Sequence, residues 1–165
     1  MFQEKIQNYE KEGKPIVYID ESGFAVDQPR THGYSQKGER CFGLHNWHEK
    51  GRINAIGALI GFSFLTVMLL NTSINSDIFY AWVTQELLPI IPRYSVVVMD
   101  NAPFHKRKDI QEAFDKQQVI LEYLPSYSPD LNPIEKKWAQ AKAIRKQQRC
   151  DPFSLFAEHI RYDNL

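Results

Sequence analysis

The sequence predicts an α/β fold in which a mixed five-stranded sheet carries helices on both faces. Three strand-like segments come first, and strand-like segments then alternate with helical ones along the rest of the chain. Strands that alternate with helices pair in parallel, whereas consecutive strands joined by short turns pair antiparallel. The length of 165 residues and the 43% of hydrophobic residues suit a single domain over residues 1–165 with a substantial core.

The first three strands are predicted at residues 15–20, 52–60 and 63–71. The first, PIVYID, ends in an acid, and the polar, glycine-bearing residues 24–51 that follow indicate a long loop or a ribbon insertion. Residues 53–70 are apolar over about the length of a membrane span, but polar residues interrupt them and Gly61–Phe62 suits a turn. We therefore expect a buried hairpin here and no contact with a membrane.

The second half of the chain predicts helices and strands in turn. A helix, a strand, a helix and a strand are expected at residues 76–91, 94–99, 106–117 and 119–123. Ser76 can cap the first of these helices. The proline-rich stretch LPSYSPDLNP is a loop, after which Asn132 and Pro133 begin a helix that runs to about Gln148. Asp151–Pro152 repeats the cap-plus-proline pattern before a final short helix.

Charge is unevenly distributed, although 20 basic and 20 acidic side chains cancel. A zero net charge alone argues against a general nucleic-acid binder. However, residues 136–149 hold six basic side chains and no acid, namely Lys136, Lys137, Lys142, Arg145, Lys146 and Arg149. The remaining chain then has 14 basic side chains against 20 acidic ones. Such a run either contacts DNA phosphates or forms a solvated helix face, and both interpretations stay open.

Location is indicated by the cysteines and by the N-terminus. Cys41 and Cys150 are far apart and have no metal-like spacing, which suits a reducing, cytoplasmic compartment. Residues 1–14 alternate Glu and Lys and lack an apolar signal core, so they are interpreted as an N-terminal extension.

Three carboxylates stand out by their positions. Asp20 and Asp100 each directly continue an apolar run, and Glu135 lies in the first turn of the late helix. Buried carboxylates need a partner or a metal, and sites are assembled at the ends of strands in parallel or mixed sheets. Because no cluster of His or Cys accompanies them, these oxygen ligands favour Mg²⁺ or Mn²⁺, and a pair of such ions suits phosphoryl transfer.

Each acid also has a structural interpretation. Glu135 follows Asn132 by three positions, which is the spacing of a capping box. Asp20 and Asp100 could simply end strands at turns. Glu21 is an alternative ligand beside Asp20, but neighbouring strand residues point to opposite faces, so only one of the two is expected to face a given site.

Three stretches resemble a known family. VYIDESGF, VVVMDNAPFHK and LPSYSPDLNPIEKKWA resemble, in order, the catalytic blocks of the mariner-like DDE transposases, and look nearest to the bacterial insertion-sequence branch. The 34 residues between Asp100 and Glu135 match the spacing familiar in that branch, and THGYSQKGER resembles a further block. The resemblance covers about residues 15–150.

The resemblance implies a ribonuclease H-like fold and a catalytic, metal-binding triad of Asp20, Asp100 and Glu135. It also implies two magnesium ions, endonuclease cleavage at the transposon ends, and transfer of the freed 3′ hydroxyl to target DNA in the nucleoid of a bacterium. Full-length members carry N-terminal helix-turn-helix modules, which these residues lack. A separate helix-turn-helix subunit, an artificially shortened chain or a degenerate element would each explain this, and a homodimer is left open.

Several residues keep two interpretations. His105 matches the family block and either contacts phosphate or has a structural role. Trp138 is expected in the core. His32, His45 and His48 are too loosely spaced for a zinc site, and relatives use the corresponding region to contact subunits or DNA.

Two other functions compete with a transposase catalytic domain. One is a ribonuclease H-like nuclease without a transfer step. The other is a domesticated or inactive domain that binds DNA or a partner without catalysis.

Overall fold

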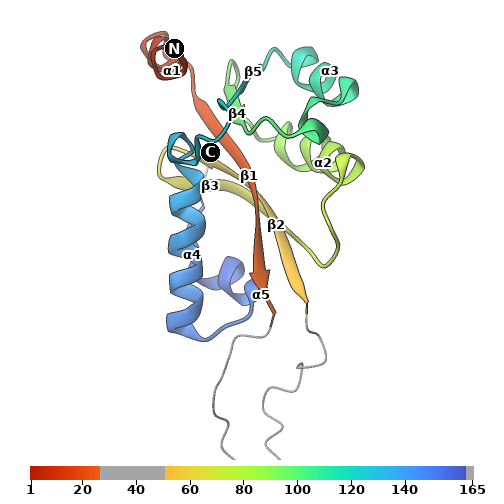
Figure 1. The fold of residues 1–165 in the computed structure, drawn as a ribbon, viewed down its shortest axis with the longest axis vertical. Coiled ribbons are helices and arrows are strands. Elements are labelled where there is room, and N and C mark those ends of the chain that lie inside the picture. The colour runs from red at the N-terminus through yellow and green to blue at the C-terminus, as the bar shows by residue number, and fades with distance from the viewer. Residues whose placement is uncertain (27–50, 163–165) are drawn as a thin grey trace, which may run out of the picture.

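Five strands form one mixed sheet in the order β3-β2-β1-β4-β5, with helices on both of its faces (Figure 1). This arrangement confirms the predicted sheet. The computed structural model describes residues 1–26 and 51–162. The predicted loop or ribbon at 24–51 lies almost entirely outside the described residues, as do Cys41, the THGYSQKGER block and the three histidines of the rejected zinc site.

The antiparallel half of the sheet contains β1 (Ile16–Ala25), β2 (Arg52–Ile60) and β3 (Ser63–Leu70). Gly61 turns the β2–β3 hairpin with a φ of +59°, a conformation that favours glycine. The hairpin is therefore confirmed, and no helix in the described residues is long and apolar enough to cross a membrane. The predicted end of β1 at Asp20 was wrong, because pairing with β2 carries this strand through its polar continuation to Ala25.

The parallel half contains the short strands β4 (Val96–Met99) and β5 (Ile120–Tyr123). Each β4 residue that pairs with β1 is numbered 80 higher than its partner, as in Tyr18 with Val98. The same offset brings Asp100 opposite Asp20. Because β4 ends at Met99, β1 has an open edge on this side from about Asp20 onward.

The α-helices of the described residues flank the sheet and are α1 (Phe2–Lys11), α2 (Ser76–Trp82), α3 (Lys108–Lys116), α4 (Ile134–Gln148) and α5 (Pro152–Ser154). A π-helical turn, Val83–Leu87, continues α2. The N-terminal extension contains α1, a helix that the sequence pattern did not indicate. It is held by Ile6, which packs with Val96, Val98 and Leu124. The cap of α2 is Asn75 rather than Ser76, since the Asn75 side chain accepts from the Ile78 amide at 2.9 Å.

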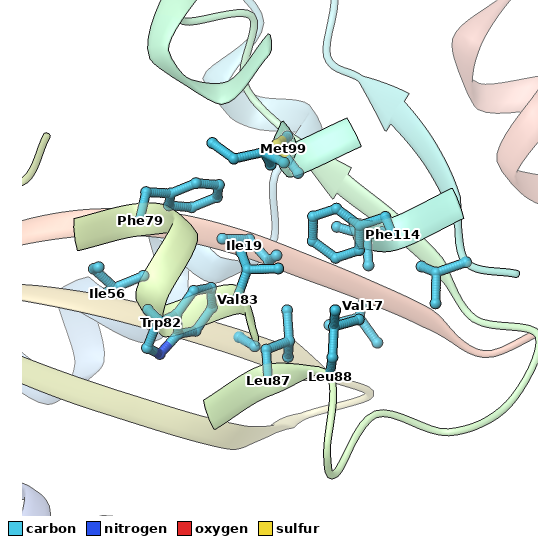
Figure 2. Packing of buried hydrophobic residues seen from close by; sticks show 14 of the residues in the cluster. Val17, Ile19, Ile56, Phe79, Trp82, Val83, Leu87, Leu88, Met99 and Phe114 are labelled. Atoms are coloured by element: carbon cyan, nitrogen blue, oxygen red, sulfur yellow. The ribbon is translucent and has the colours of Figure 1, made fainter. Parts of the chain in front are cut away.

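One core layer lies between the sheet and α2 and α3. Figure 2 shows Val17 and Ile19 of β1 packed among Phe79, Trp82 and other apolar side chains of this layer. Alternate residues of β1 face the opposite layer, because successive side chains of a strand point to opposite faces.

The second core layer lies between the sheet and α4. The 2% exposed ring of Trp138 packs against Phe24 and Phe64, so its predicted core position is confirmed. The approach is close at Gly57, where a β-carbon would lie 2.6 Å from the Trp138 ring. Since Gly57 pairs with Asp20, the same register fixes α4 and its first turn next to Asp20.

Candidate active site

The three predicted carboxylates meet at one pocket of about 380 Å³. Asp20 comes from the middle of β1, Asp100 directly follows β4, and Glu135 comes from the first turn of α4. The loop between β5 and α4 supplies much of the remaining wall, with Asn101 on the β4 side. Residues separated by more than a hundred positions therefore line a single recess beside the open edge of β1.

Asp20 is the most deeply placed of these acids, with 7% of its surface exposed. Burial raises its pKa to about 8, and a hydrogen bond with the Glu135 carboxyl group and the negative charges of Glu135 and Glu21 act in the same direction. The Asp20 carboxyl group therefore lies buried beside two further acids, Glu135 and Glu21. Such a crowded group of acids is typical of a site that holds a cation.

Asp100 is fixed in orientation by two donors that reach the same oxygen. Its Oδ1 accepts from the amide of Ala102 at 3.0 Å and lies 2.8 Å from Nδ1 of His105. The His105 hydrogen bond lowers the pKa of Asp100 most strongly, against the effect of burial. These bonds leave Oδ2 as the oxygen that a cation would meet.

His105 lies inside the protein, with 0% exposure, between the rings of Phe79 and Phe104. Its Nε2 lies 2.7 Å from Oε1 of Glu21, on the opposite side of the imidazole from Asp100. Burial opposes the charged form, but hydrogen bonds to the two carboxylates outweigh it and raise the pKa of His105 to about 10. The predicted contact of His105 with DNA phosphate is therefore wrong, because this ring is buried and orients the acids.

Glu21 reaches the same cluster, contrary to the expectation that only one of two neighbouring strand residues faces the site. One oxygen from each of Asp20, Glu21 and Asp100 lies within 4.8 Å of the others. The two β1 side chains do belong to opposite faces, but β1 lacks a neighbour on this side beyond β4. Side chains from both faces therefore converge around an open edge. Glu21 follows Val17 and Ile19 at alternate positions of β1, and those two residues are buried in the core. An acid in this otherwise apolar series was the feature of the sequence that could have indicated its role.

Glu135 does not act as the second half of a capping box. The amide of Asn132, which a capping-box Glu would accept from, donates to the Pro129 carbonyl at 3.1 Å. The Asn132 side chain accepts from Ile134 at 3.4 Å instead. The Glu135 carboxyl group instead forms a hydrogen bond with Asp20, and Glu135 lines the pocket.

The six basic residues of 136–149 do not form a single surface. Lys142 and Lys146 lie on the same side of α4 as Glu135, because seven and eleven positions return to nearly the same helix face, whereas Arg149 follows the helix in a left-handed conformation. Lys136 and Lys137 turn away from this line. Arg145 is 2% exposed and donates to the carbonyls of Cys150 and Val26, so its predicted role in DNA binding is replaced by a structural one.

The donor set suits a hard divalent cation. Among the described residues, the nearby ligand atoms are carboxylate oxygens, which Mg²⁺ and Mn²⁺ prefer, and both ring nitrogens of His105 are bonded to acids. The raised pKa of Asp20 indicates negative charge that the protein itself does not compensate. Asp20, Asp100 and Glu135, with Glu21 adjacent, are thus the residues that could hold such an ion.

The sheet order, the helices on both faces and the acids at the open edge of β1 are those of a ribonuclease H-like domain. The chain belongs to the DDE superfamily endonuclease family, which matches residues 15–154. It is 28% identical to the Tc3 transposase of Caenorhabditis elegans over 131 residues, covering 74% of this chain and 40% of that protein. The chain spans less than half the length of the curated relatives that it matches.

Solved structures of the Mos1 transposase share this fold. A paired-end complex with the left transposon end has a TM-score of 0.61 and 17% identity, over 87% of this chain and 46% of that one. The Mos1 catalytic domain with raltegravir and Mg has a TM-score of 0.57 and 16% identity, over 86% and 68% of the two chains. At these identities the likeness supports the fold, which agrees with the ribonuclease H-like architecture expected from the sequence.

Proposed function

We propose that this chain is the catalytic domain of a DNA transposase that cleaves and transfers DNA strands with divalent metal ions. The observation that carries the proposal is the convergence of Asp20, Asp100 and Glu135 on one pocket, with the pKa of Asp20 raised by burial and by Glu135. Membership of an endonuclease family agrees with this chemistry. The relatives named transposases favour transposition over hydrolysis alone.

Asp20, Asp100 and Glu135 would hold the ions, and Mg²⁺ or Mn²⁺ is the expected metal. When bound, a pair of such ions activates the attacking oxygen and stabilises the leaving oxygen of an in-line displacement at phosphorus. The chain's own part is to hold the carboxylates in position. His105 and the Ala102 amide hold Oδ1 of Asp100, while packing of Trp138 fixes the start of α4 and hence Glu135.

DNA would approach along the exposed face of α4. Lys142 and Lys146 follow Glu135 on one side of this helix, and Lys142 Nζ lies 5.3 Å from the centroid of the Phe24 ring on β1. A line of positive charge that ends at the acids suits a phosphate backbone that enters the pocket, since phosphate contacts position DNA without reading its sequence. Arg149, the C-cap that follows α4, is a further basic residue near the end of this helix.

Several properties of the whole protein stay predictions. They are recognition of transposon ends, assembly as a homodimer, a partner that supplies helix-turn-helix modules, and membership of the bacterial branch. The matched transposases are much longer than this chain, so end recognition is not assigned to these residues.

The test is nicking of supercoiled plasmid DNA in the presence of Mg²⁺ or Mn²⁺. We expect Asp100→Ala to abolish nicking, with circular dichroism and thermal unfolding like those of the wild-type protein. Asp115→Ala, which changes an exposed acid on α3, serves as the matched control and should nick normally. Nicking by Asp100→Ala at the wild-type rate would remove this acid from the mechanism and favour a non-catalytic DNA-binding domain.

Transfer is tested separately, with oligonucleotides that carry pre-cleaved transposon ends. Covalent joining of these ends to a target plasmid supports a transposase. Cleavage without joining would identify a ribonuclease H-like nuclease that lacks the transfer step.

A further inference from the structure

The aromatic ring of Tyr127 stands free at the mouth of the acidic pocket. Tyr127 lines this pocket from the loop between β5 and α4, and its side chain is 101% exposed, so the described chain does not cover it. Its backbone φ is 56°, in the left-handed region that costs a non-glycine residue about 1 kcal/mol or more. Neither burial nor backbone preference accounts for a tyrosine here.

The loop that carries Tyr127 is anchored at both ends. The amide of Leu124 donates to the carbonyl of Met99 at 2.8 Å, directly before Asp100, and Leu124 itself is buried. At the other end, Asn132 is buried and its carbonyl accepts from the amide of Glu135 in α4 at 3.1 Å. The base of the Tyr127 side chain is therefore tied to the two elements that carry Asp100 and Glu135.

The part of the pocket lining that the structure describes contains three acids and no lysine or arginine. In the proposed function the divalent ions held by these acids attract the scissile phosphate, whereas a nucleobase beside it needs an attraction that does not depend on charge. Tyr127 is the aromatic residue of this lining, and its π-face provides such an attraction.

We propose that Tyr127 stacks on a nucleobase next to the scissile phosphate and holds that nucleotide out of the duplex. This inference rests on the proposed function. Asp20 is recessed, so a phosphate that reaches the acids must leave the regular path of the double helix, which unstacks a neighbouring base. An exposed aromatic ring at the rim replaces the lost stacking, and such stacking is worth about 1–3 kcal/mol per base whatever the base is.

Plasmid nicking under single-turnover conditions measures the contribution of the ring. Stacking energies of this size predict that Tyr127→Ala slows nicking roughly 5- to 140-fold. Tyr127→Phe and Tyr127→Trp should keep the wild-type rate within a few fold, whereas Tyr127→Leu should be as slow as the alanine variant. If Tyr127→Leu nicked DNA as fast as Tyr127→Phe, the proposal would be overturned, because stacking needs a π-face.

Tyr94 provides a matched control. It is also an exposed tyrosine with a positive φ of 61°, but it precedes β4 and therefore lies at the opposite end of this strand from Asp100. Tyr94→Ala should nick at the wild-type rate. An equal loss in the two alanine variants would attribute the effect to general damage and overturn a specific role for Tyr127.

Photocrosslinking gives a direct readout of the contact. A short duplex with a single-nucleotide gap, and with 5-iododeoxyuridine at the unpaired position beside it, is irradiated with the protein and Mn²⁺. The expected result is a crosslink to the peptide that contains Tyr127, lost in Tyr127→Ala and kept in Tyr94→Ala. An unchanged crosslink in Tyr127→Ala would overturn the stacking contact.

The Asp100 and Tyr127 variants test the proposed function and the stacking contact separately. If Asp100→Ala abolishes nicking but Tyr127→Ala does not change it, stacking by Tyr127 is excluded while the proposed function stands. If Asp100→Ala nicks normally, the proposed function itself fails.

Discussion

Nδ1 of His105 lies 2.8 Å from Oδ1 of Asp100, so a fully buried imidazole fixes the rotation of a carboxylate at the rim of the pocket. The same ring reaches Glu21 with its other nitrogen. Both ring nitrogens thus have acids as partners, and the imidazole links β1 to the segment that follows β4.

Replacement of this ring should weaken metal binding. Asn at position 105 is too short to contact both acids, so we expect His105→Asn to lower the affinity for Mn²⁺ about 10- to 100-fold, as the loss of outer partners of metal ligands generally does. Isothermal titration with Mn²⁺ measures this, and nicking should recover partly at high metal concentration. His159→Asn, in a partly exposed position, is the control. Equal metal affinity in His105→Asn and the wild type would contradict the positioning role.

Removal of the buried charge on Asp20 should stabilise the metal-free protein while abolishing its function. Burial and Glu135 raise the pKa of Asp20 to about 8, above the 3.8 of an unfolded chain. The ionised carboxylate therefore costs no stability below pH 3.8, and its cost grows as the pH rises towards about 8. In EDTA at pH 8 we expect Asp20→Asn to raise the free energy of unfolding by about 1–3 kcal/mol.

Metal addition completes the Asp20 test. A ligand that binds only the native state at 100 times its Kd stabilises by about 2.7 kcal/mol. Mn²⁺ should therefore raise the Tm of the wild-type protein and leave that of Asp20→Asn nearly unchanged. Asp115→Asn, on the exposed surface of α3, should follow the wild type throughout. A full metal-induced increase in Asp20→Asn would remove this residue from the metal site.

The two sides of α4 should differ in DNA binding. Lys142 and Lys146 share the side of Glu135, so we expect Lys142→Gln/Lys146→Gln to weaken binding and to reduce the slope of log K against log salt by about 1 per lost phosphate contact. Lys136→Gln/Lys137→Gln removes the same charge from the other sides of the helix and should have a smaller effect. Fluorescence anisotropy at several salt concentrations measures both. Identical slopes in the two double variants would contradict a directed path along α4.

A methyl group at Gly57 should disturb both the fold and the site. The added β-carbon of Gly57→Ala would lie 2.6 Å from the Trp138 ring, which must move, and overpacking of this kind costs about 1–3 kcal/mol. Because Trp138 lies one turn after Glu135, nicking should also fall. Gly51→Ala, where nothing lies within 4 Å of the added carbon, is the control for urea unfolding and nicking. If Gly57→Ala had the free energy of unfolding of the wild-type protein, α4 would be able to move away from the added carbon without a loss of stability.

Local patterns in the sequence determined most of the strands and helices. Runs such as VVVM before Asp100 are short and apolar at every position, which suits a strand buried on both faces. The Asp151–Pro152 cap also followed from local chemistry, since the Asp151 side chain accepts from the Ser154 amide at 2.8 Å. The sequence did not predict helix α1, because this charged segment has a single buried residue, Ile6. Packing of Ile6 on the sheet holds the helix in place.

The sequence by itself determined which acids adjoin apolar runs and which basic residues belong to one helical segment, because these are properties of neighbouring positions. Only the tertiary structure decided which of them meet. It brought Glu21 to the cluster through the open edge of β1, buried His105 between two carboxylates, and turned Arg145 inward to backbone carbonyls. Such contacts depend on strand register and helix rotation, which arise from packing across long separations in the chain and leave no periodic trace along it.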